Sequence, residues 1–195
     1  EIKNVNDELL VRSPSNMLGY WNDPEATKEI IDSEGWLHTG DKVNIKNGHI
    51  YITGRIKDIL VLSNGEKVPP GDMELAITLD PLFEQALVVG EGKPFLTAIV
   101  VLEPDIWRME AVKQDFDINQ DGILDSKSVQ RFVLKRIKDR LKGFPGYANV
   151  KAVTLKKDQW TVENGTMTPT LKLKRHEILK RNQDAITRMY QKYQK

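Results

Sequence analysis

The chain has 195 residues, which is long enough for one large domain or two small ones. Its 29 Lys and Arg side chains almost balance its 28 Asp and Glu side chains, so with a net charge of +1 neither nucleic acid nor an anionic membrane surface is the default partner. The absence of cysteine excludes disulfides, thiolate metal sites and a cysteine nucleophile, and it fits the reducing cytoplasm, where we expect the protein. No apolar run approaches the roughly 20 residues of a membrane helix.

The N-terminal part of the chain predicts short strands and one short helix. Residues 9–11 form an apolar run that is typical of a strand. Residues 23–31 predict a helix, because an Asp in the N-cap position is followed by Pro at the first helical position. Residues 43–52 alternate between apolar and polar side chains around an Asn-Gly pair, which indicates a β-hairpin.

The rest of the chain predicts alternating strands and helices. Apolar runs indicate strands at residues 59–62, 84–89, 95–102 and 150–155. Helical spacing of apolar side chains and turn residues indicate helices at residues 69–79, 105–112, 127–141 and 176–193. The predicted fold class is therefore α+β, a small mixed sheet with flanking helices, preceded by a stub that contains the β-hairpin.

Residues 117–125 match most of a calcium-binding EF-hand loop. Oxygen-bearing side chains occupy positions one, three, five and nine, and the turn Gly occupies position six. Position twelve, which should supply a bidentate Glu, is Ser128, so two oxygen ligands and a negative charge are lost. We interpret the segment as a surface turn and predict no metal site. A non-catalytic calcium-binding or protein-interaction module remains the alternative of a different class.

Three polar segments carry stronger chemical signals when they are taken together. In residues 35–41, Asp41 follows a Thr-Gly turn, and its two carboxylate oxygens can chelate the diol of a ribose. Residues 53–59 follow the hairpin and include an Arg and a Lys. Residues 168–175 form a basic cluster on a loop, and such lysines can neutralise phosphate oxygens. Taken alone, each segment also fits a simpler interpretation, either a capping side chain at a turn or a solvated surface.

In order and spacing these segments resemble the adenylate-forming (AMP-binding) superfamily, which includes acyl-CoA synthetases, luciferases and peptide-synthetase adenylation domains. Residues 7–21 are similar to the segment that closes the large N-terminal domain of the family. Residues 54–74 look like the hinge and the loop after it. Residues 168–175 are close to the Pro-Thr-Leu-Lys form of the final family motif, which favours the long-chain fatty acyl-CoA synthetase branch.

The resemblance implies two parts. Residues 1–56 would be the incomplete C-terminal end of the large AMP-binding domain, and residues 57–195 would be a mobile C-terminal lid. The family's phosphate-gripping loop, adenine-stacking aromatic side chain and acyl pocket lie upstream of the segment that matches Glu1, and the chain does not open with Met. We therefore expect a C-terminal fragment that does not catalyse adenylation alone.

The resemblance also implies roles for individual residues. Asp41 would hold the ribose hydroxyls of ATP or AMP, and Arg55 would contact the ribose–phosphate region. Lys57 would be the hinge, and an ordinary lysine at a strand edge is the alternative interpretation of that position.

Further roles fall on two loops. Lys172 would be the catalytic lysine of adenylation, but Leu171 stands where the commoner family version has Gly, so Lys174 remains a rival. The loop that faces the pantetheine channel of CoA would contain Ser63, Gly65 and Glu66.

The function that the resemblance implies is that of an ATP-dependent fatty acid–CoA ligase, an acid–thiol ligase. Such an enzyme forms acyl-AMP with Mg²⁺ on the phosphates of ATP and then forms acyl-CoA, while the lid rotates between the two steps. The alternative is a fatty acyl-AMP ligase or related adenylating enzyme that passes the acyl group to a carrier protein. The expected partners are fatty acid, ATP, CoA and the chain's own N-terminal domain, and peripheral contact with a membrane stays open.

Overall fold

The structure, a computed structural model, describes residues 1–55 and 59–191. The chain divides into two compact units, Glu1–Ile59 and Leu60–Lys195. Lys57, the predicted hinge, lies outside the described residues.

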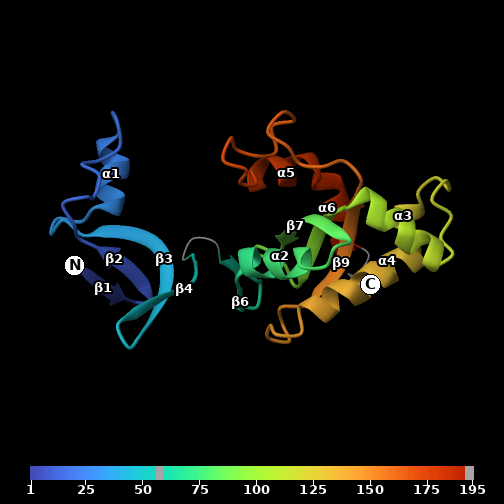
Figure 1. Cartoon of the computed structure of the whole chain (residues 1–195), viewed down its shortest axis with the longest axis horizontal. Coiled ribbons are helices and arrows are strands. Elements are labelled where there is room, and N and C mark those ends of the chain that lie inside the picture. The colour runs from blue at the N-terminus through green and yellow to red at the C-terminus, as the bar shows by residue number, and fades with distance from the viewer. Residues whose placement is uncertain (56–58, 192–195) are drawn as a thin grey trace. The chain divides into compact units, whose positions relative to one another are not determined.

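The first unit is a four-stranded antiparallel sheet with one short helix (Figure 1). The strands pair in chain order, β1 (Ile2–Val5), β2 (Glu8–Val11), β3 (Leu37–Lys46) and β4 (His49–Arg55). Asn47 and Gly48 connect β3 to β4 with φ angles of 51° and 76°, as the predicted two-residue hairpin turn requires. The sheet gives this unit a β-rich character, as predicted.

The helix of the first unit begins where the Asp-Pro pair predicts. Helix α1 (Pro24–Ile30) has Asp23 as its N-cap, and the Asp23 carboxylate accepts a hydrogen bond from the backbone N–H of Ala26. This bond satisfies one of the free N–H groups in the first turn of the helix.

The second unit contains two small sheets and five α-helices among its described residues. The first sheet pairs β5 (Leu60–Val61) with β6 (Lys67–Val68), and the second has the order β7 (Phe83–Val89), β8 (Leu96–Leu102) and β9 (Val150–Lys156). Strands β7 and β8 are antiparallel and β8 and β9 are parallel, so the predicted mixed sheet is confirmed. The helices are α2 (Pro70–Thr78), α3 (Pro104–Lys113), α4 (Lys127–Arg140), α5 (Arg175–Arg181) and α6 (Gln183–Gln191), and a 3₁₀ turn, η1, spans Ile123–Asp125.

Helices cover both faces of the central strand β8, in which every residue is buried. Alternate residues of β8 belong to two separate hydrophobic clusters, as the two-residue period of a strand requires. One cluster is completed by α2, α3 and α4, and the other by α5 and α6. A strand that is buried on both faces is predominantly apolar, which explains why its sequence is an apolar run interrupted only by the buried Thr97.

Two predicted elements differ from the structure. The strand predicted at residues 59–62 shortens to the two residues of β5, because Leu62 already enters a tight turn in which its N–H donates to the carbonyl of Glu66. The single helix predicted at residues 176–193 is broken at Asn182 into α5 and α6. The buried Asn182 side chain donates to the carbonyl of Ile178, at 2.7 Å, and this local bond competes with the helical pattern.

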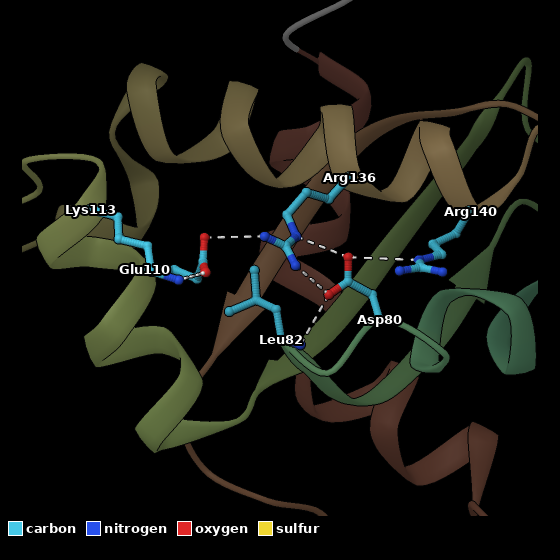
Figure 2. A network of polar contacts seen from close by, with 6 residues as sticks. All are labelled: Asp80, Leu82, Glu110, Lys113, Arg136 and Arg140. Carbon is cyan, nitrogen blue, oxygen red and sulfur yellow. Dashed lines mark hydrogen bonds and ion pairs between the residues drawn. The ribbon is translucent and has the colours of Figure 1, made fainter.

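A polar network ties the end of α2 to α3 and α4 (Figure 2). The side chain of Asp80 is only 4% exposed, and the guanidinium of Arg136 donates to both its oxygens, at 2.7 and 2.9 Å. The N–H of Leu82 also donates to Asp80, and Arg140 lies 3.8 Å from it. Arg136 also donates to Glu110, at 3.2 Å. The network joins residues up to 56 positions apart, and no sequence pattern predicted it.

In the part of the chain that the structure describes, no helix is both long enough and apolar enough to cross a bilayer.

Candidate functional site

The structure brings Asp41 and Arg55 together. They are direct partners across strands β3 and β4, and the Nε of Arg55 lies 3.2 Å from an oxygen of Asp41. Both side chains were predicted separately to contact the nucleotide. Among the described residues, the other carboxylate oxygen of Asp41 takes part in no hydrogen bond or ion pair, so it is available to a ligand hydroxyl.

The backbone before Asp41 is held by the neighbouring strand. One oxygen of Glu8 accepts from the N–H of Gly40, at 3.0 Å, and the other lies 2.9 Å from Nδ1 of His38. The hydroxyl of Thr39 donates to a β2 carbonyl and accepts from the N–H of Asp41. Glu8 was not predicted as a site residue, because its partners are about thirty positions away and no local pattern connects them.

A surface pocket of the first unit lies against this motif. Its lining includes Glu8, Tyr20, Leu37, Thr39, Gly40 and Arg55. The lining therefore combines apolar and aromatic side chains with the guanidinium of Arg55 and the carboxylates of Glu8 and Glu29. That composition suits a ligand with a flat or apolar body and polar hydroxyl or phosphate groups.

The loop with the two candidate lysines is a tight turn in the second unit. An isolated bridge between Met167 and Leu173 closes it, and the N–H of Thr168 donates to the carbonyl of Lys172, at 2.8 Å. The side chains of Lys172 and Lys174 are exposed, and within the described residues neither ammonium group forms an ion pair. Lys172 lies in the turn, whereas Lys174 is the residue before helix α5. Both ammonium groups are therefore free to meet an anion.

The third cation of this basic cluster has a structural role. The guanidinium of Arg175 forms an ion pair with Glu74 on α2, and it donates to the carbonyl of Val88 on β7, at 2.8 Å. Glu74 in turn accepts from the N–H of Val88. These bonds fix the start of α5 directly after the lysine loop. From the sequence, Arg175 was predicted to belong with the two lysines, and its partner Glu74 was not predicted.

Leu171 has a backbone conformation that normally favours glycine. Its φ is +60° and its side chain is 69% exposed, and this is the position where the commoner family motif has Gly. A left-handed conformation costs an L-residue about 1–2 kcal/mol. Replacing the residue by Gly removes this cost, but part of the gain is lost because Gly has more conformational freedom in the unfolded chain. We expect Leu171→Gly to stabilise the protein by about 1 kcal/mol and to raise its Tm by about 2–4 °C.

Thermal unfolding followed by circular dichroism measures this change. Leu171→Ala is the matched control, because it removes the exposed side chain and keeps the strained backbone. An equal gain in both variants would show that the side chain, and not the left-handed backbone, is the source.

The predicted CoA-channel residues lie in the turn between β5 and β6. Ser63 is exposed, and its N–H donates to the carbonyl of Lys93, at 3.0 Å. Gly65 has a φ of +86°, and the N–H of Glu66 donates to the side chain of Asn64. No hydrogen bond or ion pair among the described residues joins this turn to the lysine loop.

The EF-hand-like segment forms an ordinary turn. Asp117 accepts from the N–H of Asn119, and the side chain of Ile123 is buried in the core. Across residues 1–55 and 59–191, no group of three or more His, Asp or Glu side chains could hold a metal ion. The geometry therefore gives no support to a calcium-binding module.

Comparisons with known proteins agree on one family. The profile of the AMP-binding enzyme C-terminal domain matches residues 57–194. The chain is 35% identical over 188 residues to the peroxisomal long chain acyl-CoA synthetase 7 of Arabidopsis thaliana, and 34% identical over 187 residues to long-chain-fatty-acid–CoA ligase 6 of Homo sapiens. Each match covers 94% of this chain but only 27% of the relative.

Solved structures show the same relationship. The adenylation domain of the carboxylic acid reductase from Segniliparus rugosus, solved with AMP and a co-purified carboxylic acid, superposes with a TM-score of 0.80 at 25% identity. The match covers 95% of this chain and 28% of that one. Together with the matched profile and the acyl-CoA synthetase relatives, this likeness shows that the chain belongs to the AMP-binding enzyme C-terminal domain family of adenylate-forming enzymes.

Proposed function

We propose that the chain is the C-terminal part of an ATP-dependent fatty acid–CoA ligase that forms acyl-AMP and then acyl-CoA. The relatives named as long-chain acyl-CoA synthetases support this proposal, since they match 94% of the chain. The observation that carries the proposal is the Asp41–Arg55 pair beside a pocket. This pair places a carboxylate that can accept hydrogen bonds from a ribose diol next to a cation that can bind a phosphate.

In this proposal Asp41 and Arg55 bind the nucleotide. The free oxygen of Asp41 accepts hydrogen bonds from the ribose hydroxyls, and Arg55 lies close enough to meet the phosphate side of the same nucleotide. The bonds to Glu8 and Thr39 hold the motif in place before the ligand arrives. Preorganised donors and acceptors lower the cost of ordering on binding.

Lys172 has the role of charge neutralisation in the first step. An oxygen of the fatty acid carboxylate attacks the α-phosphorus of ATP, an O–P bond forms, and pyrophosphate leaves. The reaction brings two anions together, so catalysis consists largely of positioning and electrostatic stabilisation. An exposed ammonium group without an ion pair, on a turn held by Arg175 and Glu74, suits that role.

The second step needs other groups at the same acyl carbonyl. A thiol attacks the carbonyl carbon, a C–S bond forms, and AMP leaves. We propose that the lid rotates about Lys57, so that the lysine loop leaves and the turn with Ser63, Gly65 and Glu66 faces the CoA channel. Rotation of one domain about a short hinge is a common solution when one site serves two reactions.

Mg²⁺ commonly accompanies ATP in phosphoryl and nucleotidyl transfer, where it neutralises phosphate charge. In the described part of the chain, no cluster of three carboxylate or imidazole side chains could hold it. We therefore assign no residue of this chain to Mg²⁺.

The acyl acceptor distinguishes this proposal from its alternative. In a fatty acyl-AMP ligase or related enzyme, a carrier protein replaces CoA as the acceptor. The full-length protein, incubated with a long-chain fatty acid and ATP, should form acyl-CoA from free CoA and no acyl-carrier product. Acylation of a phosphopantetheinyl carrier without acyl-CoA formation would favour the alternative. We propose that the 195-residue chain alone forms no acyl-AMP, which ATP–pyrophosphate exchange tests.

Asp41 provides the direct test of nucleotide binding. In the full-length protein we expect Asp41→Ala to raise the KM for ATP by about 10- to 100-fold, because hydrogen bonds to a charged group contribute about 1.5–3 kcal/mol. The KM for CoA should change little. Asp184→Ala, at an exposed position of α6, is the matched control. An unchanged KM for ATP in Asp41→Ala would remove Asp41 from the nucleotide site.

A further inference from the structure

Helix α4 concentrates positive charge that the rest of the chain does not share. Its fourteen residues include six Lys or Arg side chains and a single acidic side chain, although the whole chain has a net charge of only +1. The remainder of the chain is therefore net acidic. The charge on α4 is a local feature that the overall composition conceals.

The six cations of α4 divide into two groups. Arg136 and Arg140 turn toward the buried Asp80 and belong to its network (Figure 2). The other four, which we call the basic face, are exposed, and they form no ion pair with any described residue. The basic face consists of Lys127, Arg131, Lys135 and Lys138.

The spacing of the basic face places its members on one side of the helix. They follow one another at intervals of four, four and three residues, and such residues are neighbours on a helix surface. At 1.5 Å per residue the face extends about 16 Å along the axis. The buried side chains Val129, Val133 and Ile137 lie on the opposite side, packed into the core.

Lys142, just after the helix, and two members of the basic face surround the only acidic side chain of the helix. The ammonium of Lys142 lies 2.8 Å from the carboxylate of Asp139. The hydrogen bond and charge of Lys142, with the further charges of Lys135 and Lys138, hold the pKa of Asp139 below its ordinary value. One carboxylate is therefore surrounded by several cations, and the face has positive charge left over for an external anion.

From this geometry we infer that the basic face of α4 docks on an anionic lipid surface. A straight row of long, flexible cations complements a laterally mobile layer of anionic headgroups, and each such side chain contributes about 1 kcal/mol near that surface. The face carries no aromatic side chain on which a nucleic-acid base could stack. The net acidic remainder of the chain also opposes wrapping by a long polyanion.

The packing of α4 determines the character of this contact. The apolar side of the helix is occupied by the core, so the helix has no apolar side chains to insert into the bilayer. Binding should therefore be electrostatic, reversible and sensitive to salt. Docking on a bilayer does not depend on the proposed adenylation chemistry, although a fatty acid substrate would be concentrated there.

Vesicle co-sedimentation of the purified chain tests this inference. We expect the chain to sediment with phosphatidylcholine vesicles that contain about 30% phosphatidylserine at about 0.01 M salt, and to be released at about 1 M salt. Vesicles of phosphatidylcholine alone should not bind it. Neutralising the basic face (K127Q/R131Q/K135Q/K138Q) should weaken partitioning about fivefold for each cation removed.

The matched control removes the same charge elsewhere. K46Q/K67Q/K157Q/K180Q neutralises four exposed lysines elsewhere in the chain and should keep most of the binding. Circular dichroism shows whether each variant is folded. Equal loss of binding in the two variants, equal binding to neutral vesicles, or tighter binding to a DNA duplex than to anionic vesicles at the same salt would each overturn the inference.

Discussion

Replacing Arg136 by Met is expected to destabilise the Leu60–Lys195 unit by about 3 kcal/mol. The substitution leaves the carboxylate of Asp80, whose side chain is 4% exposed, without its bidentate partner. Removing one member of a buried pair costs about 3–5 kcal/mol, and we take the lower end because Arg140 remains at 3.8 Å. Urea denaturation, followed by circular dichroism, measures the free energy of unfolding.

Two further variants isolate the cause. Arg131→Met removes an exposed cation from the same helix and should change the free energy of unfolding by no more than about 0.5 kcal/mol. Adding Asp80→Leu to Arg136→Met removes the stranded carboxylate and should restore part of the loss. A loss in Arg136→Met as small as that in Arg131→Met would show that the network contributes little.

The same network makes the unit sensitive to acid. Burial alone would raise the pKa of Asp80, but the hydrogen bonds from Arg136 and Leu82 and the charges of Arg136 and Arg140 outweigh it and hold the pKa below its ordinary value. The Asp80 carboxyl therefore binds a proton more readily in the unfolded chain than in the folded one. Its contribution to the free energy of unfolding is fully present above about pH 4 and is lost as the pH falls through the pKa of the folded state. Unfolding of Asp80→Asn should depend less on pH in this range than unfolding of the unchanged protein.

Local patterns predicted most of the fold. The Asn-Gly pair defined the hairpin of β3 and β4, and the Asp-Pro pair defined the start of α1. The break at Asn182 was not predicted, because the apolar side chains of α5 and α6 follow one helical period and Asn tolerates helical positions. Only the burial of Asn182 and its bond to Ile178 in the folded core decide the break.

Partners that are distant in sequence limited the prediction of the site. The hairpin was predicted over residues 43–52, and its strands continue far enough in the structure to pair Asp41 with Arg55, whose roles were predicted separately. The bond between Glu74 and Arg175 joins residues 101 positions apart, and no periodicity or motif connects them. The motif likeness identified the lysine loop, but only the fold shows that Arg175 anchors it and that the lysines are free.

Replacing Lys172 by Ala in the full-length protein is expected to slow acyl-AMP formation by about 10²–10³-fold, which is the usual cost of removing one preorganised group from a developing anion. Formation of acyl-CoA from preformed acyl-AMP should not change, because in the proposed second step the lysine loop has left the site. Single-turnover measurements of the two half-reactions separate these effects. The Tm should also stay the same, since the side chain is exposed and no ion pair with a described residue is lost.

Lys174→Ala is the matched control, because it removes another exposed ammonium group two residues away. Lys172 lies in the turn that Thr168 closes, whereas Lys174 precedes α5, next to the Arg175 anchor. The side chain in the turn should therefore reach a substrate more easily, and Lys174→Ala should keep most of the adenylation rate. A larger loss in Lys174→Ala would transfer the role to Lys174, and equal loss of both half-reactions in Lys172→Ala would contradict the proposed division of labour.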